Sequence, residues 1–180
     1  MVRRIFLLAV NAAWLSFVID RLLARVRAGR AREPLRMQVV VNAPIDETWA
    51  IVADIPLQPS WMVEMREVRI TTPGPTGVGT RGQATVRIAG ISVTDPVEVV
   101  EFQPPHRFAI RHEGLFTGGG LITLEASADG QATTVRWDET LIPPLFPELC
   151  ALVQAPILRS IFQGDLARLK RLVETGSPDA

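Results

Sequence analysis

The sequence predicts an α+β fold: a curved antiparallel sheet packed against a long C-terminal helix, with two short helices after the first strand. First, residues 147–174 carry apolar side chains at the spacing of one helix face. Second, residues 68–141 change to alternating apolar and polar positions, which is typical of strands. Third, the connections between these strands are short, which favours antiparallel neighbours and places the helices on one side of the sheet.

The C-terminal segment, residues 147–174, predicts one long helix. At about 1.5 Å per residue it would extend roughly 40 Å, so it needs a broad apolar surface to pack against. Pro156 removes a backbone hydrogen bond, so we expect it to bend this helix or to end its first part, and Gly164 is a second candidate bending site. The charged residues on the opposite face are expected to remain in water: Arg159, Asp165, Arg168, Lys170 and Arg171.

Composition excludes several classes of function. The 180 residues contain 19 Lys and Arg against 19 Asp and Glu, so no net charge would recruit a nucleic acid. Cys150 is the only cysteine, which rules out an intramolecular disulfide, and two histidines make a multi-histidine metal site improbable. Residues 77–82 match the glycine spacing of a dinucleotide fingerprint, but a strand pattern follows them, so we interpret them as a turn. We expect no cofactor and no metal.

The N-terminal segment, residues 5–19, is apolar except for Asn11 and Ser16. Fifteen helical residues rise about 22 Å, less than the roughly 30 Å of a bilayer core, although flanking arginines could extend the span by snorkelling. Three interpretations remain open: membrane attachment, either spanning or lying in the interface; packing on the domain or on a second copy; and a processed export signal. The first predicts membrane contact through residues 5–23. Arginines after the segment outnumber those before it, so a spanning anchor would leave the globular part cytoplasmic.

The expected organisation follows from these segments. Residues 1–27 form an apolar N-terminal helix acting as a membrane anchor, 28–34 a linker, 35–175 the globular domain and 176–180 a tail. Within the domain, the run Gly118-Gly119-Gly120 is expected to let the chain turn. The expected strands are 35–42, 68–72, 80–89, 92–102, 107–113, 121–127 and 133–141, and the expected short helices are 45–53 and 60–65.

Several motifs together resemble one superfamily. They are Ala43-Pro44, Asp46-Glu-Thr-Trp49, Asp54-Ile-Pro followed by Pro59-Ser-Trp61, Gly77-Val-Gly-Thr-Arg-Gly82 and Val99-Val-Glu-Phe-Gln-Pro-Pro105. In these motifs and in its C-terminal helix the chain resembles the START-like, Bet v 1-type (SRPBCC) superfamily, and most closely its polyketide cyclase/dehydrase and lipid-transport branch. The resemblance covers residues 35–174. It implies a helix-grip fold with a deep apolar cavity between sheet and long helix, used by carriers and by enzymes for lipids, sterols, aromatic polyketides or quinones. The apolar N-terminal extension is not part of the superfamily's common domain.

His112 and Glu139 are the candidate acid and base, because each shares the face of an otherwise apolar strand. A buried carboxylate needs a partner, water or a proton. Beside a cavity carboxyl group, a histidine could act on an enolisable carbonyl, as cyclisation or dehydration requires. The alternatives are a polar group that orients a ligand and a structural or solvated position at the sheet rim.

The primary functional hypothesis is binding or transport of a small hydrophobic ligand that is lipid-like, polyketide-like or quinone-like. The alternatives are a cyclase/dehydrase-type enzyme using His112 and Glu139, and a protein-interaction module with a collapsed cavity. The candidate ligand-binding residues are Trp61, Met65, Val86, Ile88, Ile110, His112, Phe116, Leu124, Trp137, Glu139, Val153, Pro156, Ile157 and Phe162.

Overall fold

The computed structural model describes residues 2–30, 32–88 and 90–179. The predicted order of elements is confirmed, and most bounds shift by a few residues. The second short helix begins earlier than expected, because the Asp54 side chain accepts the N–H of Leu57 and Pro56 fits its first turn. The elements are α1 (Val2–Arg27), β1 (Leu35–Val41), α2 (Ile45–Val52), the 3-10 helix η1 (Ile55–Ser60), β2 (Met65–Ile70), β3 (Arg81–Ile88), β4 (Ile91–Gln103), β5 (Arg107–Glu113), β6 (Thr117–Ala126), β7 (Thr133–Ile142) and α3 (Pro147–Thr175).

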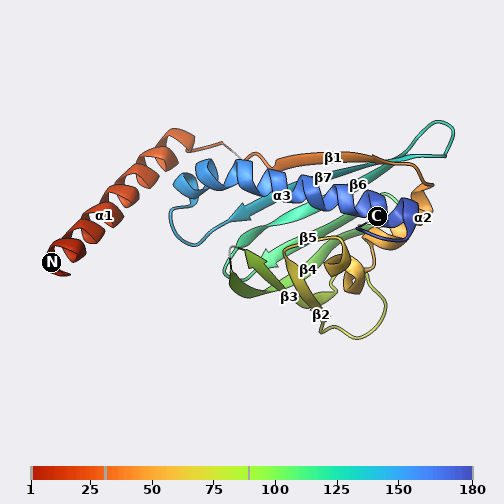
Figure 1. Cartoon of the computed structure of the whole chain (residues 1–180), viewed down its shortest axis with the longest axis horizontal. Helices are drawn as coiled ribbons and strands as arrows, with labels where there is room; N and C mark the ends of the chain where they lie inside the picture. The colour runs from red at the N-terminus through yellow and green to blue at the C-terminus, as the bar shows by residue number, and fades with distance from the viewer. Residues whose placement is uncertain (1, 31, 89, 180) are drawn as a thin grey trace.

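The strands of the described chain form one seven-stranded sheet in the order β1-β7-β6-β5-β4-β3-β2. Every neighbouring pair is antiparallel. Figure 1 shows α3 running along this curved sheet, with α2 near the C-terminal end of α3. This is the α+β, helix-grip arrangement that the sequence predicts.

The glycine run does not form a turn, so that prediction is wrong. Gly118, Gly119 and Gly120 lie inside β6, where they pair with β5 and β7. A Cβ atom at Gly118 or Gly119 would overlap backbone oxygens of Thr140 or Ile110. The run therefore permits close strand approach, and the chain turns just before it, at residues 114–116.

The core lies between the sheet and the C-terminal half of α3. Leu166 and Leu169 of α3 are fully buried, together with Trp61 and with Val135 of β7. The helix is continuous through Pro156, so this proline does not end it. The N-terminal half of α3 is less covered: Leu152, Val153 and Ile157 are all exposed.

The N-terminal helix α1 contacts the first turn of α3. Oδ1 of Asp20 accepts the backbone N–H groups of Glu148 at 2.8 Å and Leu149 at 2.9 Å, and Asp20 is only 6% exposed. Arg27 and Arg32 both pair with the Glu148 carboxylate, at 2.8 and 2.5 Å. Because no side chain at the N-cap position of α3 accepts a hydrogen bond, Asp20 supplies that cap from another helix.

The remainder of α1 extends away from the domain in Figure 1. Large apolar side chains along it are exposed, among them Leu8, Trp14, Leu15 and Leu22. Within residues 2–30, 32–88 and 90–179, no helix combines the length and the apolarity that crossing a membrane requires. Membrane contact through α1 stays a prediction.

Candidate functional site

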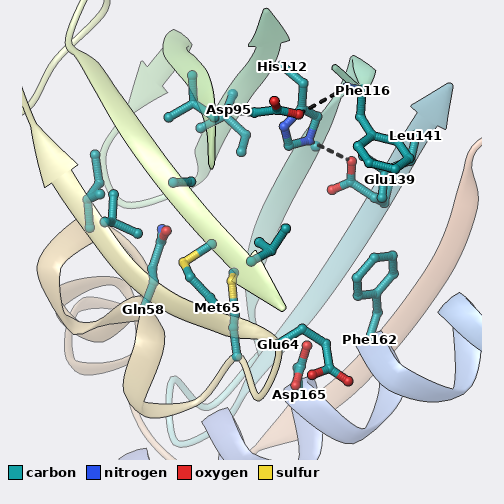
Figure 2. Close-up of a pocket in the computed structure, with 18 of the residues that line it drawn as sticks. Gln58, Glu64, Met65, Asp95, His112, Phe116, Glu139, Leu141, Phe162 and Asp165 are labelled. Atoms are coloured by element: carbon teal, nitrogen blue, oxygen red, sulfur yellow. Dashed lines mark hydrogen bonds and ion pairs between the residues drawn. The ribbon is translucent and has the colours of Figure 1, made fainter. Parts of the chain in front are cut away.

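A cavity of about 520 Å³ lies between the sheet, the η1–β2 segment and α3. Figure 2 shows side chains from the strands and from α3 converging on it. Its wall is almost entirely apolar, and a few polar side chains interrupt it. A cavity of this size and lining suits a small ligand that is mainly hydrophobic, held by few polar contacts.

Most of the predicted binding residues line this cavity. The period-two pattern places the alternate residues of β5 and β7 on the inner face. The α3 helix covers them with an aromatic side chain: the Phe162 ring packs at a tilt of 36° against Trp137, with ring centroids 4.8 Å apart. The predicted residues in the wall are Met65, Val86, Ile110, His112, Phe116, Trp137, Glu139, Ile157 and Phe162.

The other predicted binding residues lie elsewhere. Trp61 and Leu124 are buried in the core outside the cavity wall, and Trp61 packs edge-on against Trp137 at 6.2 Å. Val153, at 62% exposed, and Pro156 lie on the solvent side of α3, because the helix turns Leu158, Ile161 and Asp165 inward instead. The Ile88 side chain lies outside the described residues.

His112 and Glu139 meet in the cavity wall. Nε2 of His112 lies 3.1 Å from Oε1 of Glu139, and the indole N–H of Trp137 donates to Oε2 at 2.9 Å. Glu139 is 3% exposed, so both of its oxygens have partners where water is scarce. When Nε2 of His112 carries the hydrogen and donates it to Glu139, Nδ1 is the nitrogen that holds a lone pair. The pair can therefore orient a polar group or exchange a proton with it.

Asp95 on β4 holds the segment that carries Phe116 and was not among the predicted site residues. Its two oxygens accept the backbone N–H groups of Leu115 at 2.8 Å and Phe116 at 3.0 Å. A Cβ atom at Gly114 would overlap this carboxylate, so the glycine makes the close approach possible. The signal was present in the sequence, because Asp95 alternates with Val93 and Val97 on the inner face of β4.

Asp165 is buried, so the prediction that it remains in water is wrong. Its side chain lines the cavity and is 2% exposed, because it stands four residues after Ile161 and four before Leu169 on the inward stripe of α3. Burial raises the pKa of Asp165 to about 6; the N–H of Val63 opposes this rise and the nearby charge of Glu64 adds to it. The helical spacing could have revealed its position.

The other polar side chains of the cavity wall suit hydrogen bonds better than metal coordination. Within the described residues, no three His, Cys, Asp or Glu side chains converge as metal ligands would. Gln58 of η1 also lines the cavity, and its Nε2 donates to the carbonyl of Val52 at 3.4 Å. The polar groups of the wall thus suit hydrogen bonding to an organic molecule.

Solved structures share this fold. A Deinococcus radiodurans protein is 23% identical with a TM-score of 0.60, covering 78% of this chain and 96% of its own. A Thermus thermophilus protein is 18% identical with a TM-score of 0.64, covering 79% and 98%. The Zhui aromatase/cyclase from a Streptomyces species is 18% identical with a TM-score of 0.57, covering 78% and 95%. At these identities the likeness concerns the fold alone.

The sequence comparisons differ in outcome. None of the curated proteins matches the chain. A family model described as polyketide cyclase/dehydrase and lipid transport matches residues 34–174, which is nearly all of the chain after α1 and the segment following it. The motifs, the helix-grip fold and this match agree, and the chain therefore belongs to the polyketide cyclase/dehydrase and lipid-transport family.

Proposed function

We propose that this protein binds a small hydrophobic ligand, of lipid-like, polyketide-like or quinone-like character, in the cavity between the sheet and α3. The observation that carries the proposal is the cavity itself, about 520 Å³ with an apolar wall. Close-packed interiors rarely leave such a space, because empty apolar volume costs stability. An occupant that removes apolar surface from water would recover part of that cost.

The His112–Glu139 pair would orient the ligand at one end. It presents polar atoms in a wall that otherwise offers mainly apolar contacts, so a carbonyl or hydroxyl group of the ligand would find its partner there. Trp137 and Phe162 form an aromatic surface beside the pair, against which a flat ring or a chain can pack. One polar end and an apolar body describe the class of ligand.

The test is to identify what the protein retains after purification. Native mass spectrometry of the full chain, followed by organic extraction and mass spectrometry of the extract, should reveal one apolar molecule per chain. The matched control is Val86→Trp, which fills the cavity from β3 and should abolish retention. Equal retention by both proteins would reject the cavity as the binding site.

A cyclase/dehydrase-type reaction is the second candidate, supported by the 3.1 Å contact between His112 and Glu139 in the cavity wall. His112 would accept a proton from the carbon beside a ketone, and the resulting enolate would attack a second carbonyl to form a carbon–carbon bond. The protonated imidazole would then return its proton to the alkoxide, and loss of water would complete a dehydration. Glu139 would hold the imidazole in place. His112→Gln and Glu139→Gln should each abolish such turnover while ligand retention persists.

The third hypothesis, an interaction module, supposes a collapsed cavity, and the cavity of about 520 Å³ supports ligand binding better.

We also infer that α1 contacts a membrane surface. Exposed apolar side chains such as Trp14, Leu15 and Leu22 lie on the same helix as Arg21 and Arg25. An apolar helix with adjacent arginines suits the boundary of a bilayer that contains anionic lipids. Because α1 also contacts the first turn of α3, membrane contact would place the domain's cavity helix close to the lipid surface.

A further inference from the structure

The cavity has a second polar region, distant from His112 and Glu139. Figure 2 shows the side chains of Glu64 and Asp165 lying close together on the opposite side of the drawn pocket. Glu64 directly precedes β2 and Asp165 projects from α3, and both line the cavity. Two carboxyl groups thus share this end of a mainly apolar cavity.

The environment of Asp165 leaves one oxygen for a ligand. The backbone N–H of Val63 donates to Oδ1 at 2.9 Å, and in the described part of the chain Oδ2 accepts no hydrogen bond. Arg168, one turn further along α3, makes its ion pair with Asp179 at 2.7 Å, and its charge acts on Asp165 only by lowering the pKa of that carboxyl group. Asp165 is only 2% exposed and its side chain lines the cavity. A carboxylate in such a poorly hydrated position loses part of its hydration, and a hydrogen-bond donor on a molecule bound in the cavity would compensate for that loss.

We propose that Asp165, together with Glu64, binds the hydrogen-bond-donating end of the ligand, an ammonium or hydroxyl group. The cavity then takes elongated molecules with an apolar middle and a donor at the α3 end. This inference rests on the proposed function, because it requires that a ligand occupies the cavity. The raised pKa of Asp165 agrees with it: the fold keeps a carboxyl group where burial disfavours its charge, which is typical of positions retained for function.

The test compares three molecules that share a ten-carbon chain: decylamine, decan-1-ol and 1-methoxydecane. The first two donate hydrogen bonds and the ether cannot. Each is titrated at pH 8 against the full chain holding the fluorescent probe 1-aminoanthracene, and displacement gives the dissociation constants. Asp165→Asn is the informative variant, because its Oδ1 can still accept the N–H of Val63 while an N–H donor replaces Oδ2. Glu64→Gln tests the second carboxyl group. Asp46→Asn, on the surface of α2, is the control for loss of one charge.

The wild-type protein and Asp46→Asn should bind decylamine at least tenfold more tightly than 1-methoxydecane, with decan-1-ol between them. Asp165→Asn should reduce the ratio between the dissociation constants of 1-methoxydecane and decylamine to threefold or less, without weakening the binding of 1-methoxydecane. Glu64→Gln should reduce this ratio by a smaller factor. Equal binding of the three molecules by the wild type, or an unchanged ratio in Asp165→Asn, would overturn the role of Asp165 in binding the donor end of the ligand. Binding of 1-aminoanthracene would in that case still support the proposed ligand-binding function. Failure of 1-aminoanthracene itself to bind would overturn both.

Discussion

Gly120 on β6 lies opposite Glu139 on β7, and a Cβ atom at Gly120 would overlap Oε2 of Glu139. The same Cβ atom would lie 3.2 Å from the indole nitrogen of Trp137, which donates to that oxygen. The glycine thus provides the space in which the buried Glu139 carboxylate meets its two partners. A strand residue without a side chain is therefore part of the site.

Gly120→Ala should displace the Glu139 carboxylate and weaken its bonds to Trp137 and His112. Alanine is favoured over glycine in a strand by roughly 0.5–1 kcal/mol, but overpacking costs about 1–3 kcal/mol, so the net effect is destabilising. Urea denaturation should show the loss. Gly164→Ala is the matched control, because its Cβ atom meets nothing within 4 Å, and it should stabilise α3 by about 1 kcal/mol. Unchanged stability in Gly120→Ala would contradict the packing described.

Asp20→Ala should destabilise the start of α3, because it removes the acceptor for the N–H groups of Glu148 and Leu149. The loss of an N-cap acceptor costs about 1 kcal/mol. Hydrogen exchange should accelerate at these two amides and remain unchanged at the buried C-terminal half of α3. Asp20→Asn keeps an acceptor oxygen and should show a smaller effect. Equal exchange in all three proteins would show that α1 does not cap α3 in solution.

Asp165→Asn should change how stability depends on pH. The folded-state pKa of Asp165 is raised from 3.8 to about 6, so between these values the folded state binds more protons than the unfolded state. Stability attributable to this group therefore falls as pH rises from about 4 to about 6, and stays reduced above that.

Asp165→Asn cannot titrate at this position, so its stability should not fall between pH 4 and pH 6 as that of the wild type does. At pH 8 the variant should be more stable than the wild type by about 1–2 kcal/mol. This is less than the full pKa shift of Asp165 implies, because water in the cavity screens the charge. At pH 4 the two should be similar. Urea denaturation at both values measures the difference, with Asp46→Asn as the control for a surface charge. A wild type that is as stable as the variant at pH 8 would show that Asp165 is not desolvated.

The exposed apolar side chains of α1 predict binding to lipid vesicles. Full-length protein should sediment with vesicles of phosphatidylcholine and phosphatidylserine, and less with phosphatidylcholine alone, because arginines on α1 add attraction to anionic lipid. Trp14→Glu should reduce sedimentation at least fivefold without altering the fold of the domain. Val40→Glu, an exposed apolar position on β1, is the matched control and should have no effect. Equal losses in both variants would assign the binding to general hydrophobicity.

The strand alternation is sufficient to predict the wall of the cavity on β5 and β7. His112 follows Phe108 and Ile110 on one face, and Glu139 follows Trp137, so a period of two brings the pair to the cavity from opposite sides of β6. The helical period also predicts α3 itself. These local patterns have strong physical causes, since burial fixes which face each side chain occupies.

Other features depend on contacts between distant segments and are not predictable in this way. To predict that Asp20 caps α3, one must know where α1 and α3 meet, because Asp20 and Glu148 are 128 residues apart in the sequence. The run Gly118–Gly120 suggests a turn because glycine serves both turns and close strand approach, and only the neighbouring strands decide between them. Trp61 and Leu124 are apolar like the cavity residues, but the packing of the core encloses them completely.

The most direct test of the account is a titration of 1-aminoanthracene into the wild type, Val86→Trp and Val40→Trp. Val86 lines the cavity, whereas Val40 is 52% exposed on β1, so the two variants add the same side chain inside and outside. We predict binding of one probe per chain with a blue-shifted emission in the wild type and in Val40→Trp, and at least tenfold weaker binding in Val86→Trp. Equal binding by all three proteins would contradict the claim that the space between the sheet and α3 is a ligand-binding cavity.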